Sequence, residues 1–261
     1  MQHHPAHPNR HPIWLTLMLT VILICSLTLQ PNELTAQTNP PRPTNGFLTG
    51  PNNGDPLDIA LAYLRQNAQA YGLRSTDIQD LIVLSRYQSA HNGVTHITLR
   101  QRLNGIEVFN GDININVARD GSIINLVNHF EGNLAQRVNR MRPVIGSPEA
   151  LARAGFELNL TPRSAINNPS SIISSTIQSA RGDDLQTSYL APSVSTDPVP
   201  MQLIFQPFED RTIRLAWNMV LRLPDGSDWL DLRVDAENGA LLSQVSWKSH
   251  HRLSSQQADS G

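Results

Sequence analysis

The histidines of this chain are the first residues that could bind a metal. His91 lies on a predicted turn, His96 on the strand that follows it, and His129 in another predicted strand. A closed zinc site needs several good ligands whose spacing lets them converge. Because these histidines share no obvious face, we predict structural or surface roles for them and no metal site.

Two serines lie close in sequence to groups that could activate them. Ser89 precedes His91, and Ser85 follows Asp80. A serine nucleophile needs an adjacent, oriented base, and in many hydrolases it also lies in a glycine-flanked elbow. Neither serine has such a pattern around it, so we predict no nucleophile and no catalytic residue.

Three aspartates crowd one predicted strand and could suggest a calcium site: Asp228, Asp231 and Asp235. Calcium is bound by several converging oxygen atoms. Alternation along the strand places Asp231 and Asp235 on the same face as Arg233. We interpret that face as the solvated side of a sheet, and we predict no cofactor.

The tryptophans fall into two groups. Trp217 belongs to a run in which apolar and polar residues alternate, which predicts a place in the core. Trp229 and Trp247 lie outside that run and could be exposed anchors for a partner protein.

The composition is that of a globular protein. Of the 261 residues, 39% are hydrophobic and 16% are charged, and the formal net charge is -2. A chain with so little net charge has no field that would hold a phosphate backbone, so we expect no nucleic-acid partner. Cys25 is the single cysteine, which excludes an intramolecular disulfide and a thiolate zinc cluster.

The N-terminal region has the layout of an export signal. Residues 13–29 form an uncharged apolar run, which follows a polar segment that contains Arg10. This layout predicts a signal peptide over residues 1–36, with cleavage after Ala36. The apolar run is long for a signal, so an N-terminal membrane anchor is the alternative. We expect no other contact with a membrane.

The first folded segment is predicted to be a helix over residues 55–71. The preceding residues 37–54 are rich in proline, glycine and asparagine and have little apolar content, which predicts a linker. Asp55 can cap the helix, and Gly72 can end it in the left-handed conformation.

Strands are predicted at residues 81–90, 94–103, 106–117 and 122–132. Each is rich in β-branched or aromatic residues, and Asn-Gly or Asp-Gly turns separate them. In the third strand, Ile113, Ile115 and Val117 share one face, which predicts a sheet with one dry and one wet side. The helix is expected to cover the dry side.

The pattern then repeats. Ser147 is a candidate N-cap and Pro148 a candidate first residue of a helix over residues 147–160. Residues 161–199 are rich in serine, proline and asparagine, and we predict a flexible insertion there. Further strands are predicted at residues 200–207, 212–223, 227–237 and 239–247.

These elements predict the α+β class, with two tandem units that each pack a helix on an antiparallel β-meander. The first unit is expected at residues 55–140 and the second at residues 141–247, followed by a polar tail at residues 248–261.

Two stretches carry a resemblance to a known family. Residues 89–123, SAHNGVTHITLRQRLNGIEVFNGDININVARDGSI, closely resemble the propeptide of fungalysin-type secreted zinc metallopeptidases, the FTP segment shared with thermolysin propeptides. Residues 215–245, from LAWNMVLRL to VDAENGALLSQV, resemble the PepSY-like half that follows it. The resemblance extends over residues 55–247.

In that family the propeptide is made with the protease, helps it to fold, blocks its active site and is then removed. The resemblance therefore implies a module that acts as folding chaperone and inhibitor. Its partner would be a zinc metallopeptidase catalytic domain, in cis or in trans. The implied location is secreted or in the cell envelope.

The zinc motif of such peptidases, His-Glu-x-x-His, does not occur in this sequence. Its two histidines bind the metal and its glutamate activates the bound water. We therefore expect no enzyme in the chain as it stands, which would be a truncated precursor or a stand-alone protein. The alternatives are a cell-envelope binding or adhesion module with the same fold, and an active peptidase whose catalytic domain is encoded downstream.

Overall fold

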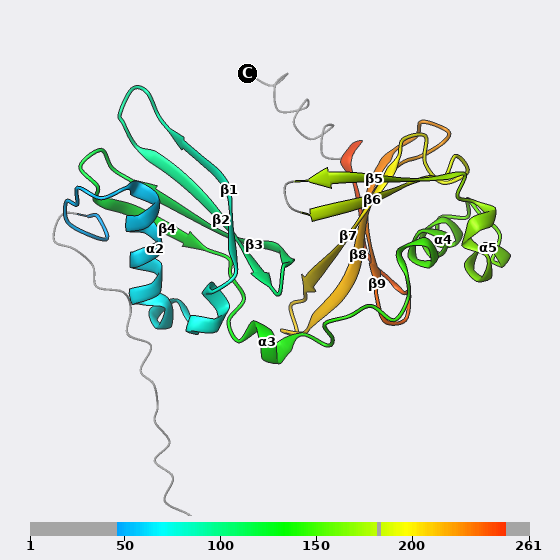
Figure 1. Ribbon diagram of the computed structural model, residues 1–261, viewed down its shortest axis with the longest axis horizontal. Coiled ribbons are helices and arrows are strands. Elements are labelled where there is room, and N and C mark those ends of the chain that lie inside the picture. Colours follow the sequence, from blue (N-terminus) through cyan, green and yellow to red (C-terminus); the bar gives the residue numbers. More distant parts are fainter. Residues whose placement is uncertain (1–45, 182–183, 249–261) are drawn as a thin grey trace, which may run out of the picture. The chain divides into compact units, whose positions relative to one another are not determined.

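The computed structural model describes residues 46–181 and 184–248 (Figure 1). The predicted signal peptide or anchor over residues 1–36 and the cysteine within it lie outside the described residues. Within those two ranges, no helix is long and apolar enough to cross a membrane.

The first half of the described chain contains α2 (Pro56–Asn67), the 3₁₀ helices η1 (Ala68–Tyr71) and η2 (Ser75–Ile78), β1 (Leu81–Gln88), β2 (Thr95–Leu103), β3 (Ile106–Val117), β4 (Ile123–Asn128) and α3 (Leu134–Arg137). The second half contains α4 (Ser147–Glu157), α5 (Ser164–Asn167), the 3₁₀ helix η3 (Pro169–Ser171), β5 (Ser175–Arg181), β6 (Asp184–Leu190), β7 (Val199–Pro207), β8 (Ile213–Arg222), β9 (Trp229–Asp235) and β10 (Leu241–Ser246). The class is α+β, with few helices and mostly antiparallel strands, as predicted.

Helix α2 has the predicted cap and the predicted stop. Asp55 is the N-cap, and its Oδ1 accepts a hydrogen bond from the Leu57 N–H at 2.9 Å. The last turn tightens into η1, and Gly72 ends it in the left-handed conformation with φ 73°.

Strands β1 to β4 form an antiparallel meander, in which each strand pairs with the next. Asn104 and Gly105 both have positive φ and form the tight turn between β2 and β3. In β3, Ile113, Ile115 and Val117 are completely buried. The predicted dry face is therefore confirmed.

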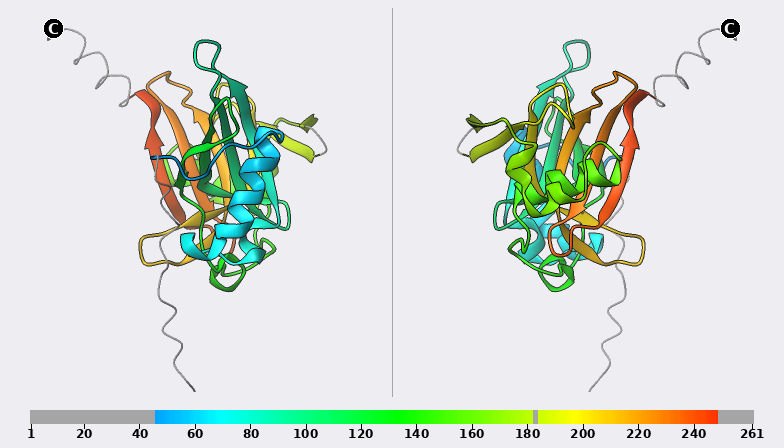
Figure 2. Two further views of the ribbon diagram at one scale, coloured as in Figure 1. Left: turned by 90° about the vertical axis from the view of Figure 1, so that its left-hand side faces the viewer. Right: turned by 90° about the vertical axis from the view of Figure 1, so that its right-hand side faces the viewer.

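Helix α2 lies across the dry face of this meander (Figure 2, left). The buried residues between helix and sheet form one cluster: Ile59, Ala60, Tyr63, Leu64, Ala68, Leu73, Ile78, Ile97, Leu99, Ile113, Ile115, Val117, Ile123 and Phe130. Each large aliphatic side chain in such a core contributes about 1.5–3 kcal/mol through removal from water.

The segment just before α2 is attached to the meander, which differs from the predicted linker. The Leu48 N–H donates to Ile123 O at 2.7 Å, and the Ile123 N–H donates to Thr49 Oγ1 at 2.8 Å. The Asn52 N–H donates to Asp120 O at 2.9 Å. The attachment is made by hydrogen bonds of the backbone. The prediction used the low apolar content of this segment, which carries no information about such bonds.

Helix α4 begins as predicted, but Ser147 is not its cap. The N-cap is Gly146, which makes no side-chain hydrogen bond, and Pro148 lies in the first turn. The Ser147 hydroxyl instead lies 2.8 Å from the Tyr189 hydroxyl. The Ser147 oxygen therefore contacts Tyr189, which is distant in sequence, and does not cap the helix.

The segment predicted as a flexible insertion contains α5, η3 and the β5–β6 hairpin, and β6 pairs with β7. Tyr189 and Val194 are buried in the core of the second half. Tyr189 lies on β6 and Val194 lies between β6 and β7, so strand pairing and a few buried side chains attach this segment to the second half.

Strands β7 to β10 form a second antiparallel meander, and α4 lies against it (Figure 2, right). In β8, the alternating residues Ile213, Leu215, Met219 and Leu221 are buried, as predicted. Trp217 is half-buried, and its Nε1–H donates to Ile145 O at 2.9 Å.

The two meanders are joined through a parallel pairing of β3 with β7, which the sequence did not predict. Glu107 lies opposite Ile204 and Val108 opposite Phe205. A small core surrounds the junction, and its buried members are Val108, Leu134, Phe205, Ile213, Leu215 and Ala236. The sheet therefore has a continuous path in the order β1, β2, β3, β7, β8, β9 and β10, while β4, β5 and β6 lie off this path.

The turn before β4 provides a test of this packing. Gly121 has φ 80°, and a Cβ built on it would lie 1.8 Å from Asn52 O. Gly226 has φ 69° with nothing within 4 Å of the same position. We expect Gly226→Ala to cost about 1 kcal/mol of unfolding free energy, from backbone strain alone. Gly121→Ala should cost at least about 2 kcal/mol more, because the N-terminal segment must move.

Urea unfolding of the two variants and the unchanged chain measures both costs. Equal destabilisation by the two substitutions would contradict the close packing of Asn52 against the turn.

Candidate functional site

The three histidines considered as metal ligands lie apart along the chain. His91 is exposed in the loop between β1 and β2, His96 is on β2, and His129 follows β4. In the part of the chain that the structure describes, no group of three or more histidine, cysteine, aspartate or glutamate residues is placed to hold a metal ion.

Ser89 contacts His96 rather than His91. Its Oγ lies 2.9 Å from His96 Nε2, and His96 Nδ1 lies 2.7 Å from Asn116 Oδ1. The Asn116 amide donates its N–H to Asn125, so its oxygen accepts the Nδ1 proton. Nε2 then accepts from the serine hydroxyl. Sequence spacing could not find this group, because it requires the register that places His96 opposite Asn116.

Serine hydrolases have a carboxylate where Asn116 stands here, and they also need donors aimed at an oxyanion. The nearby amides of Ser89 and Gly93 are already bonded to Val94 O and Ser89 O, both at 2.8 Å. The Val94 amide is bonded to Asn92 Oδ1 at 3.0 Å. These contacts order the β1–β2 loop.

Asp80, considered with Ser85, has structural partners. One carboxylate oxygen lies 2.7 Å from the Arg102 guanidinium, and the other accepts from the Gly105 N–H at 2.7 Å. Ser85 lies opposite Thr98 in the meander. Asp80 thus connects the start of β1 to the β2–β3 turn.

The prediction of a solvated face on β9 is wrong. Asp235 is completely buried and Arg233 is 2% exposed. Arg214 Nε lies 2.6 Å from Asp235 Oδ2, and Arg233 Nη2 lies 2.5 Å from Asp231 Oδ2. Phe109 of β3 covers this face, with its ring centre 3.5 Å from the Arg233 guanidinium carbon.

Burial controls the electrostatics of this contact. It raises the pKa of the Asp231 carboxyl, an effect that the charge of Arg233 opposes, and it lowers the pKa of the Arg233 guanidinium. Arg233 Nη1 also donates to Ser243 Oγ at 2.8 Å. With the aromatic ring over its face, the guanidinium connects β3 to β9 and β10.

Trp229 and Trp247 are exposed, as predicted, at 38% and 42%. Their ring centres lie 5.9 Å apart, and the Arg222 guanidinium lies 5.5 Å from the Trp229 ring. Arg222 lies at the end of β8, Trp229 at the start of β9 and Trp247 just after β10, so these three side chains are close together on the surface.

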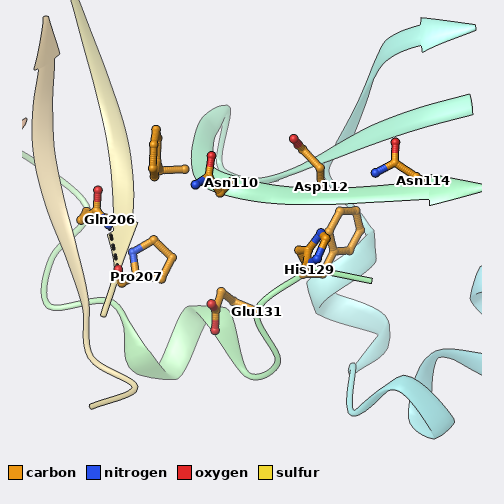
Figure 3. Close-up of a pocket in the computed structure, with 9 residues that line it drawn as sticks. Asn110, Asp112, Asn114, His129, Glu131, Gln206 and Pro207 are labelled. Carbon is orange, nitrogen blue, oxygen red and sulfur yellow. Dashed lines mark hydrogen bonds between the residues drawn. The ribbon is translucent and has the colours of Figure 1, made fainter. Parts of the chain in front are cut away.

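A groove of about 630 Å³ lies beside the junction of the meanders (Figure 3). Its lining residues are Phe109, Asn110, Asp112, Asn114, His129, Phe130, Glu131, Gln206 and Pro207. In Figure 3, Gln206 and Pro207 come from β7, and the other labelled residues come from β3 and the segment after β4. The groove therefore depends on both halves of the chain.

The acidic groups of the groove are neutralised by neighbouring arginines. Arg100 donates to both oxygens of Asp112, at 2.8 and 3.0 Å, and to Glu107 at 3.0 Å. These carboxylates raise the pKa of the Arg100 guanidinium, with the Asp112 hydrogen bonds as the largest cause. Arg137 Nη1 lies 2.6 Å from Glu131 Oε2. The rest of the lining consists of the amides of Asn110, Asn114 and Gln206, the His129 imidazole, two phenylalanines and a proline.

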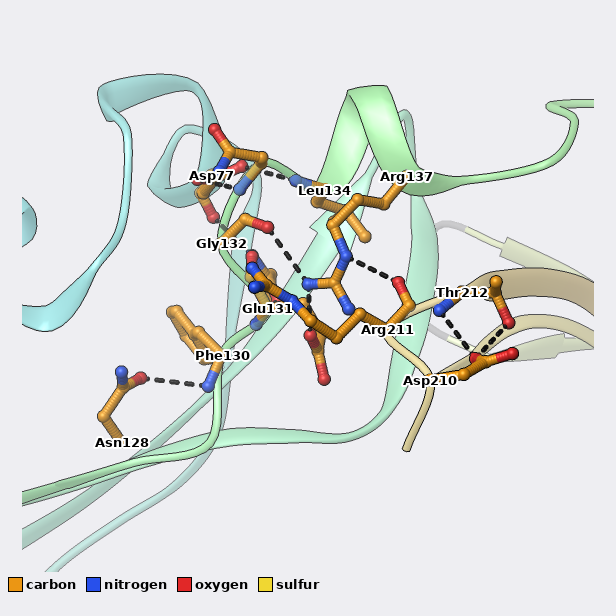
Figure 4. A network of polar contacts seen from close by, with 12 residues as sticks. Asp77, Asn128, Phe130, Glu131, Gly132, Leu134, Arg137, Asp210, Arg211 and Thr212 are labelled. Carbon is orange, nitrogen blue, oxygen red and sulfur yellow. Dashed lines mark hydrogen bonds and ion pairs between the residues drawn. The ribbon is translucent and has the colours of Figure 1, made fainter. Parts of the chain in front are cut away.

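A buried carboxylate organises the segment that leads from β4 into the junction (Figure 4). Asp77 is 2% exposed. Its oxygens accept from the backbone N–H groups of Arg74, Asn133 and Leu134, at 2.8, 2.9 and 2.9 Å. One side chain thus satisfies three amides, two of which lie far away in sequence.

Arg137 continues this network into the second half of the chain (Figure 4). Besides its contact with Glu131, it donates to Gly132 O at 3.1 Å and to Arg211 O at 2.8 Å. Hydrogen bonds of Arg137 thus link the segment after β4 to the turn before β8.

The comparison with known families identifies the first meander. Residues 79–130 match the model described as Fungalysin/Thermolysin Propeptide Motif. This segment is therefore similar to a propeptide motif. The resemblance inferred from residues 89–123 is confirmed, and the motif begins just before β1 and ends just after β4.

Several fungal proteases are similar over a longer stretch. The extracellular metalloproteinase MEP of Leptosphaeria maculans is 28% identical over 170 residues, which is 65% of this chain and 25% of that protein. The extracellular metalloproteinase mep of Aspergillus fumigatus is 28% identical over 167 residues, with 62% and 24% covered. This chain thus spans about a quarter of the length of these relatives.

Among solved structures, the Bacillus megaterium YpeB C-terminal domain matches 76% of this chain and 67% of its own. The TM-score is 0.32 and the identity 11%, which is too low to establish a shared fold.

The role of the buried Asp77 carboxylate on η2 can be tested by substitution. Asp77→Ala leaves three amides without their acceptor, and we expect a loss of about 3 kcal/mol in unfolding free energy. Asp77→Asn keeps one acceptor oxygen and should lose less. Glu209→Ala, at an exposed carboxylate, should stay within about 0.5 kcal/mol of the unchanged chain.

Denaturant unfolding of the three variants gives these values. A loss for Asp77→Ala no larger than that for Glu209→Ala would contradict the organising role of Asp77.

Proposed function

We propose that this chain is the propeptide module of a fungalysin-type zinc metallopeptidase, and that it acts as folding chaperone and inhibitor of the catalytic domain. The observation that carries the proposal is the propeptide motif at residues 79–130. The similarity to extracellular metalloproteinases supports the class of partner. The partner domain can lie in the same precursor or in a separate chain.

The chemistry of the described side chains supports a role without catalysis. Two of the candidate pairs are engaged in structural contacts, Ser89 with His96 and Asp80 with Arg102. We propose that the chain works through its surface and that it is not an enzyme.

We also propose two tandem units, an FTP-like unit at residues 55–140 and a PepSY-like unit at residues 141–247. The separate cores under α2 and α4 support this division. The module is exported through its N-terminal signal or held by it as an anchor, and the extracellular relatives support that location.

A preformed surface can assist folding in a specific way. Sheets dominated by contacts between distant segments fold slowly, because the entropy cost of closing long loops comes before the free energy gained from strand pairing. A partner that already presents paired strands and apolar contacts lowers that barrier. The same surface inhibits when it covers the active-site cleft of the folded enzyme.

The test uses the purified chain and the metalloproteinase mep of Aspergillus fumigatus as probe. We expect the chain to raise the yield of active enzyme when the denatured catalytic domain is refolded, and to inhibit the folded enzyme. Peptidase activity with a peptide substrate measures both effects, and heat-unfolded chain is the control.

An unchanged refolding yield together with unchanged activity would contradict the proposal. That result would favour the alternative of a cell-envelope binding or adhesion module.

A further inference from the structure

We propose that the outer edge of β1 pairs with an extended segment of the metallopeptidase domain, which then adds a strand to the first meander. The segment that fits this edge is uncharged and largely apolar. This inference rests on the proposed function, because the catalytic domain supplies the strand.

The first observation is the position and exposure of β1. It lies at one end of the sheet path and pairs with β2. An edge strand presents backbone N–H and C=O groups that another strand can satisfy. Every residue from Val83 to Gln88 is exposed. By contrast, β10 at the opposite end of the path has one exposed residue among six.

The pairing with β2 determines which amides point outward. The Ser89 N–H donates to Val94 O at 2.8 Å, so Ser89 directs its backbone toward the β2 side. In an antiparallel pair, such residues alternate with residues whose backbone groups point away. Arg86 and Gln88 are therefore outward-facing positions. Their spacing of two residues is the one at which an added strand forms its hydrogen bonds.

Apolar side chains flank these outward amides. Val83 and Leu84 are 46% and 42% exposed, and Tyr87 is 60% exposed. The Tyr87 ring stacks on His96 at 4.8 Å, and Ser89 hydrogen-bonds to the same imidazole. The largest exposed side chain of the edge is thus ordered before binding, which lowers the entropy cost of association.

The charge on this edge is already balanced. Natural edge strands are often protected by lysines or arginines and by bulges. A register shift lies between Val83 and Ser85, but the cation Arg86 lies 2.5 Å from Asp55. An acidic peptide would therefore have to compete with Asp55. This favours an uncharged apolar segment as the occupant.

The side chains of the edge are tested with Leu84→Lys and Tyr87→Ser. The control is Val144→Lys, at a residue that is 61% exposed and lies outside the strands. The inhibition constant is measured on the Aspergillus fumigatus metalloproteinase. We expect each edge variant to inhibit about tenfold more weakly and the control to change by less than about twofold.

The backbone is tested with Gln88→Pro, which removes an outward N–H and leaves the hydrogen bonds to β2 in place. Gln88 Nε2 also donates to Gly93 O at 3.0 Å, so Gln88→Ala is the matched control. We expect the proline variant alone to lose inhibition about tenfold. Thermal midpoints establish that each variant is folded. Hydrogen exchange of the complex should protect the amides of Arg86 and Gln88.

The possible outcomes separate the two proposals. If the unchanged chain inhibits and all edge variants inhibit equally well, the edge pairing is overturned while the proposed function stands. If the unchanged chain neither binds nor inhibits, both fail. If the free chain forms a dimer that Leu84→Lys abolishes, a second copy occupies the edge, and the inference is overturned.

Discussion

The structure depends on the double pairing of β3. β3 pairs with β2 at both of its ends, and it also pairs with β4 from Ile113 to Val117 and with β7 at Glu107 and Val108. Between these two segments the strand must bend, and Asn110 has φ 54° there. A Cβ on Gly111 would lie 2.8 Å from the Val108 side chain, so the bend requires a residue without one. The bend places Phe109 over Arg233, and it makes a groove between the halves possible.

The local elements could be predicted from the sequence because their signals are local. A capping aspartate, a left-handed glycine and alternating isoleucines are enough to predict α2 and the first meander. The same reasoning predicted the buried face of β8. It failed at Ser147, where the hydroxyl has a distant partner in Tyr189.

The groove and its supports could not be predicted, since they depend on pairings between distant segments. Alternation along β9 predicted that Asp235 faces solvent, but Asp235 is buried. The sequence does not show that Phe109 of β3 covers this face of β9. The contact of Ser89 with His96 likewise requires the register of β1 and β2. No local sequence pattern indicates that Asp77 accepts hydrogen bonds from the distant N–H groups of Asn133 and Leu134.

The central claim is that β3 makes the two helix-covered meanders one framework. Hydrogen exchange at increasing urea, followed for amides of β2 and β3 and for amides of β8 and β9, tests it most directly. The account predicts that both sets share one opening free energy and one dependence on urea. Exchange of either set while the other stays protected would show two independent units and would contradict the claim.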